Sequence, residues 1–179
     1  ILDDLIEVSV LGCQMLLQKH KKIRIIVLAG NHDPQTSTAL RIVLKFAFAN
    51  EPRVTIDDDR HLYTHYRFGD CFFGFHHGHG VPLLEFPLMC SLKWGKAWGE
   101  SIWRRLYTGH RHKQATLSVQ GVPVDILETL AAADTYADNM GYVSSRGIIC
   151  DTWHKKDGLM SRNWKYIRHI NQALEKESK

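Results

Sequence analysis

Residues 23–29 (IRIIVLA) form a short run rich in β-branched residues, and Gly30 ends it abruptly. A run of this kind, with no regular alternation of polar and apolar residues, is typical of a strand buried on both faces. On its amino-terminal side, apolar residues recur at helical spacing over residues 2–20. On its carboxyl-terminal side, Thr36 or Ser37 is a suitable cap for a second helix. The order helix, buried strand, loop and helix predicts an α/β fold.

The rest of the sequence predicts further strands and one interrupted helical segment. Strands are expected at residues 62–68 and 71–76, with a hairpin turn at residues 69–70. Residues 83–103, rich in Trp and Leu, are expected to be helical, with interruptions at one proline and two glycines. The remaining predicted features are a strand at residues 105–108 and hairpin turns at residues 120–121 and 156–158.

The composition is that of a soluble globular domain. The chain has 179 residues, 44% of them hydrophobic and 23% charged, and no apolar run approaches the roughly 18 residues that a membrane-spanning helix needs. We therefore expect one domain over residues 1–170, a polar tail over residues 171–179, and no membrane partner. The formal net charge of +4 is compatible with an anionic ligand. The four cysteines are widely spaced and no secretory segment precedes them, so we expect a reduced, cytoplasmic protein.

Histidines are concentrated in three short segments that contain glycine. Six of the eleven histidines lie in GNHD (30–33), FHHGHG (75–80) and GHRH (109–112), and each segment directly follows a strand-like run. Loops at the carboxyl ends of strands are where α/β proteins build their sites. Neutral imidazole is the commonest metal ligand, and a metal offsets the crowding of several such side chains. The pattern predicts a metal site.

Two other clusters have a structural interpretation. Trp94, Trp98 and Trp103 follow one another at spacings of four and five residues, which favours the packing face of a helix over the lining of a cleft. The acidic triplet at residues 57–59 follows a strand and is interpreted as a polar turn. The five histidines outside the three segments are given no function.

The three segments, in this order and each after a strand, resemble the carboxyl-terminal half of the signature of the calcineurin-like metallophosphoesterase family. The full signature is DxH, GDxx(D/E), GNH(D/E), HG and GHxH, and the phage- and prophage-associated members are the most similar in general character. The resemblance covers residues 23–113. It implies an α/β sandwich of two mixed β-sheets flanked by helices, with the amino-terminal strands missing.

The resemblance assigns a role to each matching residue. Asn31, His77 and His110 correspond to ligands of the second metal, and His112 to a ligand of the first. His32 corresponds to the catalytic histidine that faces the substrate and protonates the leaving alkoxide or stabilises the phosphoryl oxygens.

Three further residues, Asp33, His76 and His79, have alternative interpretations. Asp33 is a candidate partner that fixes the tautomer of the neighbouring imidazole, and its alternative role is that of a carboxylate at a helix amino terminus. The register of FHHGHG is ambiguous, because His76 and His79 compete with the histidine directly before Gly78.

The implied function is metal-dependent hydrolysis of a phosphomonoester or phosphodiester, with nucleotides and nucleic acids among the substrates. Two divalent ions, manganese first and iron, zinc, nickel or cobalt as alternatives, would share a bridging hydroxide as the nucleophile. The sequence leaves the substrate and the oligomeric state open. A structural zinc module is disfavoured because no pair of cysteines has the required spacing. A Rossmann oxidoreductase and a P-loop enzyme are disfavoured because GxGxxG and GxxxxGK(S/T) are both absent.

Neither DxH nor GDxx(D/E) occurs upstream of GNHD, so the carboxylate that bridges both metals in the family has no match. We expect that the amino-terminal part of the domain is missing from this sequence, and that the 179 residues alone are incomplete for catalysis. The alternative is a naturally truncated, inactive relative that acts as a binding or scaffold protein.

Overall fold

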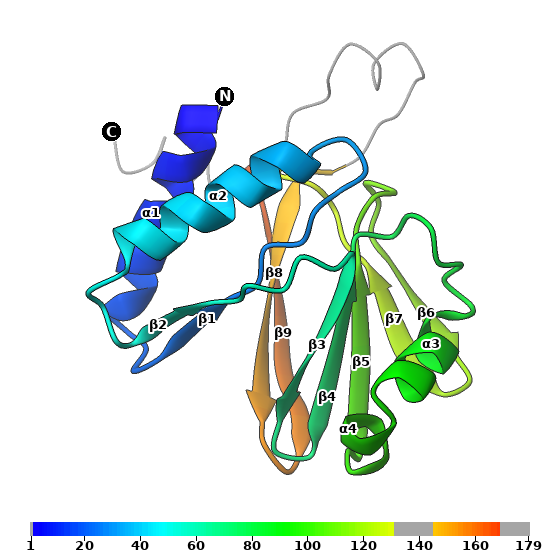
Figure 1. Cartoon of the computed structure of the whole chain (residues 1–179). Helices are drawn as coiled ribbons and strands as arrows, with labels where there is room; N and C mark the ends of the chain where they lie inside the picture. The colour runs from blue at the N-terminus through cyan, green and yellow to red at the C-terminus, as the bar shows by residue number, and fades with distance from the viewer. Residues whose placement is uncertain (1, 131–144, 169–179) are drawn as a thin grey trace. The chain divides into compact units, whose positions relative to one another are not determined.

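A computed structural model describes residues 2–130 and 145–168 of the chain (Figure 1). The chain divides into two units, residues 1–64 and residues 65–179. The predicted polar tail at residues 171–179 lies outside the described residues. Within the described ranges, no helix has the length and apolar character needed to cross a lipid bilayer.

The first unit contains two helices and one short parallel strand pair. Its elements are α1 (Leu2–Leu17), β1 (Ile23–Ile25), α2 (Pro34–Ala47) and β2 (Val54–Ile56). Apolar side chains of the helices pack against the strand pair, and the buried core consists of Cys13, Leu40, Leu44 and Phe48.

Both predicted helices of this unit are confirmed, with shifted ends. The first ends at Leu17, three residues before the predicted limit of residue 20. The second begins at Pro34, two residues before the predicted Thr36. Proline suits the first helical position, because its missing N–H would have no partner there and its fixed φ is already helical.

β1 differs from the prediction. It is limited to three residues, and its central residue Arg24 is exposed. The Arg24 guanidinium donates to both carboxylate oxygens of Asp57, at 2.7 and 2.9 Å. The prediction that this strand is buried on both faces is wrong, because a guanidinium needs solvent or a charged partner. Asp57, predicted to belong to a polar turn, is largely buried as that partner.

The second unit is built on a five-stranded mixed sheet with the strand order β3-β4-β5-β7-β6. β4, β5 and β7 are parallel, and β6 is antiparallel to β7. The division between the units falls within β3, after Thr64. The predicted α/β fold, with a mixed sheet and helices, is confirmed. The strands are β3 (Tyr63–Phe68), β4 (Cys71–His76), β5 (Trp103–Thr108), β6 (Ala115–Val119) and β7 (Val122–Ile126).

Different layers cover the two faces of this sheet, because side chains alternate along each strand. One face carries α3 (Phe86–Lys93) and α4 (Gly95–Gly99) (Figure 1). Phe72 is fully buried in the core on this face. On the other face, Phe73 contacts Trp153 edge to face, with 4.8 Å between ring centroids. Trp153 belongs to the antiparallel hairpin of β8 (Gly147–His154) and β9 (Gly158–Tyr166).

The predicted turns of the second unit are confirmed. Residues 69–70 join β3 to β4, and residues 155–157 join β8 to β9, one residue earlier than the predicted turn at residues 156–158. Residues 120–121 join β6 to β7, and both have positive φ, at 51° and 80°. Two such residues match the right-handed twist of the flanking strands.

The predicted helical segment at residues 83–103 becomes α3 and α4, and it ends before Trp103. Trp94 and Trp98 pack on the helical side of the core, as predicted. The inclusion of Trp103 is wrong, because this residue starts β5 and pairs with Cys71 of β4. Its indole N–H donates to the carbonyl oxygen of Lys156 at 2.8 Å.

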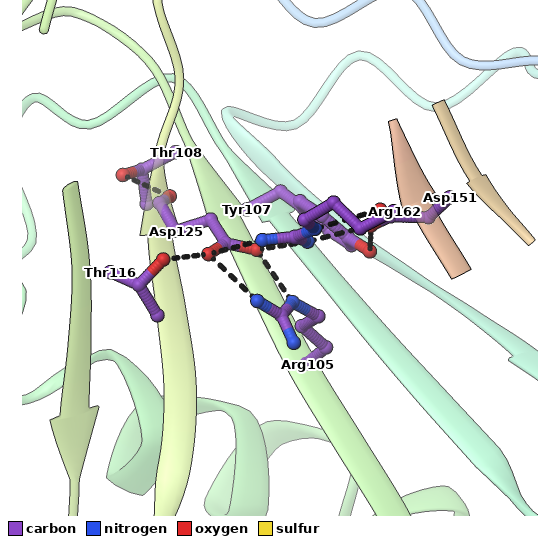
Figure 2. A network of polar contacts seen from close by, with 7 residues as sticks. All are labelled: Arg105, Tyr107, Thr108, Thr116, Asp125, Asp151 and Arg162. Carbon is purple, nitrogen blue, oxygen red and sulfur yellow. Dashed lines mark hydrogen bonds and ion pairs between the residues drawn. The ribbon is translucent and has the colours of Figure 1, made fainter. Parts of the chain in front are cut away.

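A buried network of charges joins the sheet to the β8–β9 hairpin (Figure 2). The carboxylate of Asp125, 1% exposed, accepts from Arg105 at 2.6 Å, from Arg162 at 2.7 Å and from Thr116 at 2.6 Å. Burial opposes ionisation of this carboxyl, but these hydrogen bonds outweigh it and lower its pKa to about 2. Arg162 also donates to Asp151 at 2.6 Å, so one guanidinium connects both layers.

Candidate functional site

The second and third histidine segments follow neighbouring parallel strands. β4 ends at His76 and β5 ends at Thr108, and these two residues are paired in the sheet. Parallel strands end at the same edge of a sheet, so residues 77–80 and 109–112 begin side by side. This is the edge at which α/β proteins place ligands.

A backbone hydrogen bond joins the two loops. The amide N–H of Gly109 donates to the carbonyl oxygen of His77 at 2.9 Å. Gly78 follows with a φ of 108°, and a Cβ at this position would lie 2.8 Å from the carbonyl oxygen of Gly109. Only glycine satisfies both the positive φ and the close approach. The glycine of the HG motif is therefore required by the contact between the loops.

Three imidazoles of the two loops lie next to one another. The ring centroids of His77 and His110 are 5.2 Å apart, those of His77 and His79 are 5.2 Å apart, and those of His79 and His110 are 6.0 Å apart. His110 has a φ of 65°, which is uncommon for a residue with a side chain. The structure thus brings His77 and His110, both predicted ligands, into ring contact.

His76 has the surroundings of a core residue. It is 2% exposed, its ring packs against Phe86, and its Nδ1 accepts a hydrogen bond from the amide of Gly78 at 2.9 Å. Burial first, and then the neighbouring imidazoles, lower the pKa of His76 to about 4. These contacts favour His77 or His79 over His76 as the ligand that the register of FHHGHG left open.

His79 carries a buried nitrogen without a hydrogen-bond partner. Its Nδ1 has no partner among the described residues, although the ring lies 5.7 Å from His76 and 5.2 Å from His77, centroid to centroid. An unpaired buried nitrogen among imidazoles fits the donor chemistry of a late first-row metal. Within residues 2–130 and 145–168, however, no three His, Cys, Asp or Glu side chains are arranged to hold one ion. The metal site stays a prediction.

The other predicted residues are exposed. His112 has a φ of 46° and lies two residues beyond His110 in the second unit. Asn31 and His32 lie in the first unit, in the loop between β1 and α2. Their convergence with the histidines of the second unit stays a prediction.

Asp33 has a local role at the start of α2. Its carboxylate accepts from the backbone amide of Gly30 at 2.6 Å, which closes the GNHD loop on itself. Asp33 occupies the N-cap position, but its side chain makes no capping hydrogen bond. The Asp33 carboxylate therefore holds the backbone of Gly30 and does not cap α2.

Arg41 of α2 is a buried cation that the sequence did not single out, and it contacts the segment between β1 and α2. Arg41 is 3% exposed, and its Nη2 donates to the carbonyl oxygen of Val27 at 3.3 Å. Its Nε has no hydrogen-bond partner among the described residues. The spacing of Arg41 from Ser37 and Leu44, which are also buried, could have indicated this position.

No protein-family model matches the sequence, and no curated protein matches it. Among solved structures, an archaeal phosphodiesterase is 22% identical, with 80% of this chain and 68% of that chain covered and a TM-score of 0.47. Vps29 from Entamoeba histolytica, complexed with Zn²⁺, is 14% identical, and the match covers 86% of this chain and 88% of that chain with a TM-score of 0.45. A predicted phosphoesterase from Streptococcus pneumoniae is 11% identical, and the match covers 65% of this chain and 74% of that chain with a TM-score of 0.30. Because these TM-scores are below 0.5, the likenesses carry no conclusion about this chain.

Proposed function

We propose that this chain contributes the carboxyl-terminal metal ligands of a calcineurin-like metallophosphoesterase, and that the protein hydrolyses phosphoesters. The observation that carries the proposal is the pairing of the HG and GHRH motifs. Both follow parallel neighbouring strands, a hydrogen bond joins Gly109 to His77, and the rings of His77 and His110 lie 5.2 Å apart. A pair of imidazoles held by backbone contacts is suited to metal binding.

In this proposal, Asn31, His77 and His110 hold one divalent ion, and His112 contributes to a second. Bound divalent ions would activate water and offset the negative charge that builds up on the phosphoryl oxygens. His32, exposed in the loop before α2, donates a proton to the leaving alkoxide. Asp33 holds the backbone of this loop through Gly30, at 2.6 Å, and so supports the position of His32.

The substrate class is a phosphomonoester or phosphodiester, and a nucleotide or nucleic acid is compatible with the net charge of +4. The metal pair would be manganese, with iron, zinc, nickel and cobalt as alternatives, because mixed nitrogen and oxygen ligands accept all of them.

A second candidate function is a non-catalytic relative that binds one metal and serves as a scaffold. The observation behind it is that the 179 residues contain neither DxH nor GDxx(D/E) upstream of GNHD, the motifs that supply the bridging carboxylate in the family that this chain resembles. Two divalent ions close together repel strongly, and neutral histidine and asparagine ligands do not offset that repulsion.

The first experiment measures binding of Mn²⁺ and Zn²⁺ alone to the 179-residue protein by calorimetry after treatment with a chelator. We expect at most one tightly bound ion, and a loss of affinity of at least about 10-fold in His110→Ala. The matched control is His154→Ala, which removes an exposed histidine of β8. Equal affinities in both variants would refute the assignment of the metal ligands.

The second experiment separates the two candidate functions by hydrolysis of bis(4-nitrophenyl) phosphate with Mn²⁺. We expect near-background turnover for the 179 residues alone, and chelator-sensitive turnover for a form extended upstream through GDxx(D/E) and DxH. In the active form, His32→Ala should lower turnover about 10²–10⁴-fold with metal binding retained. Turnover in the extended form that is unchanged by both the chelator and this substitution would exclude the phosphoesterase. Metal binding without any turnover would favour the scaffold.

A further inference from the structure

α1 carries apolar side chains on two opposite faces. One face packs in the core of the first unit through Ile6, Val10, Cys13 and Leu17. The other face is exposed, and its most exposed side chains are Val8 at 67% and Met15 at 68%. A helix on the surface of a globular protein normally has polar residues opposite its buried stripe. The exposed face of α1 therefore has the composition of a contact surface.

The apolar residues of the exposed face form one continuous patch. Val8, Leu11, Gly12 and Met15 are spaced i, i+3, i+4 and i+7, which places them side by side on one surface of the helix. Leu5 and Leu16 are also exposed, and they extend this surface toward the two ends of α1. The six residues together are called the α1 patch: Leu5, Val8, Leu11, Gly12, Met15 and Leu16.

Gly12 leaves a hollow in the middle of the α1 patch. Among the described residues, nothing beyond the adjacent backbone of α1 lies within 4 Å of the position that a Cβ of residue 12 would take. Glycine in the interior of a helix destabilises the helix relative to alanine. It is suited to a position where another element approaches the helix backbone closely. The hollow is therefore a place for a large apolar side chain of a second helix.

Opposite charges lie at the two ends of α1. Asp3 and Glu7 lie in the first two turns of the helix, and Lys19, Lys21 and Lys22 follow its last turn. All five side chains are exposed. Two copies of α1 that pack antiparallel bring the acidic end of each helix to the basic end of the other, whereas a parallel pair brings like charges together. The charges therefore favour a second copy of α1, in the antiparallel orientation, as the occupant of the patch.

We infer that the α1 patch is an interface between two copies of this chain, whose α1 helices pack antiparallel about a two-fold axis. The axis that places Val8 opposite Met15 of the second copy also places Leu11 opposite Gly12, so each leucine fills the hollow of the other helix. α1 has 16 residues and is about 24 Å long. Such a contact is smaller than a typical interface of about 1,600 Å², so we expect a weak dimer with a dissociation constant on the order of 10 µM. The interface contains none of the residues of the proposed metal site.

Analytical ultracentrifugation of the 179-residue protein, at concentrations from about 1 to about 200 µM, measures this association. We expect Val8→Glu with Met15→Glu to raise the dissociation constant at least about 10-fold, because carboxylates would be buried in an apolar contact. The matched control is Ile148→Glu with Met160→Glu, which replaces two exposed apolar residues of the β8–β9 hairpin and adds the same charge. A monomer at every concentration, or an equal loss of affinity in both variants, would refute the interface.

An exchange of charges tests the antiparallel orientation. Asp3→Lys with Glu7→Lys should weaken self-association, and so should Lys19→Glu with Lys21→Glu, because like charges then meet at both ends of the interface. An equimolar mixture of the two variants should recover the affinity of the unsubstituted protein, because opposite charges meet again at both ends. Self-association of the separate variants that equals that of the unsubstituted protein would refute the orientation. A mixture that stays weak would refute it as well.

Disulfide trapping locates the axis and does not depend on charge. Val8→Cys and Met15→Cys are prepared separately, each together with Cys150→Ser, which removes an exposed thiol. Residue 8 of one copy lies opposite residue 15 of the other, so the two residues 8 are offset by about 10 Å, more than the Cα separation that a disulfide spans. An oxidised mixture of the two variants, both with the circular dichroism of the folded protein, should therefore contain mainly the mixed dimer by intact mass spectrometry. An excess of dimers formed by one variant alone would overturn the inference.

Discussion

The amide N–H of Gly109 donates to the carbonyl oxygen of His77 across 2.9 Å, so the HG and GHRH motifs share one backbone contact. There is no room for a side chain between the loops at this contact, because a Cβ at residue 78 would lie only 2.8 Å from the carbonyl oxygen of Gly109. The positions of both candidate ligands thus depend on a residue that itself has no side chain.

Substitution Gly78→Ala should destabilise the second unit by about 2–4 kcal/mol, because it combines a positive φ of 108° with a collision against the backbone. Gly80→Ala is the matched control, since Gly80 also has a positive φ, of 90°, but open space around its Cβ position. Urea unfolding of both variants measures the difference. Equal losses of stability would mean that the contact between the loops is not the constraint.

Metal affinity should distinguish the histidines of the FHHGHG segment. The resemblance to the phosphoesterase family predicts that His77→Ala weakens binding of Zn²⁺ at least about 10-fold, as expected for His110→Ala, and more than His79→Ala does. Calorimetry with Zn²⁺ alone provides the measurement. A larger effect in His79→Ala would assign the ligand to His79, whose Nδ1 has no partner among the described residues.

The stability of the second unit should fall in acid because of Asp125. The pKa of this carboxyl is lowered from 3.8 to about 2, since hydrogen bonds from Arg162, Arg105 and Thr116 outweigh the effect of burial. Because the pKa is lower in the folded state than in the unfolded state, the ionised Asp125 contributes to the free energy of unfolding above pH 4, and this contribution is lost as the pH falls toward 2. The loss should be roughly 2 kcal/mol, at about 1.36 kcal/mol for each unit by which the pKa is lowered.

Urea unfolding between pH 2.5 and pH 6 measures this slope, and Asp125→Asn should flatten it, although the variant is less stable at neutral pH. A slope that persists unchanged in Asp125→Asn would place the acid sensitivity in other carboxyl groups.

Removal of one partner from the network in Figure 2 should be costly. Arg162→Met leaves the buried carboxylates of Asp125 and Asp151 without one of their donors, and about 3–5 kcal/mol of stability should be lost. The control is Arg53→Met, which removes the exposed pair with Glu51 and should cost much less stability, because solvent screens an exposed ion pair. Thermal unfolding measures both. Similar losses of stability in the two variants would show that the network does not stabilise the packing of the hairpin on the sheet.

Local patterns in the sequence determined much of the fold. The helical spacing before residue 20, the strand at residues 71–76 and the turns at residues 69–70 and 120–121 depend on neighbours in the chain, and the structure has them. The placement of two histidine segments after neighbouring strands was predictable for the same reason. Each segment follows an apolar run directly, so the end of the strand fixes where its histidines begin.

Only the tertiary structure decided which side chains are buried and which strands are partners. Asp125 and Arg162 are separated by 37 residues, and nothing near either residue indicates their ion pair. Trp103 fits a helical pattern, but pairing with Cys71 makes it the start of a strand. His76 and His77 are adjacent in sequence, yet alternation along β4 buries His76 against Phe86 and leaves His77 at the loop. Burial and strand pairing are set by contacts between distant residues, and a sequence read in order does not contain them.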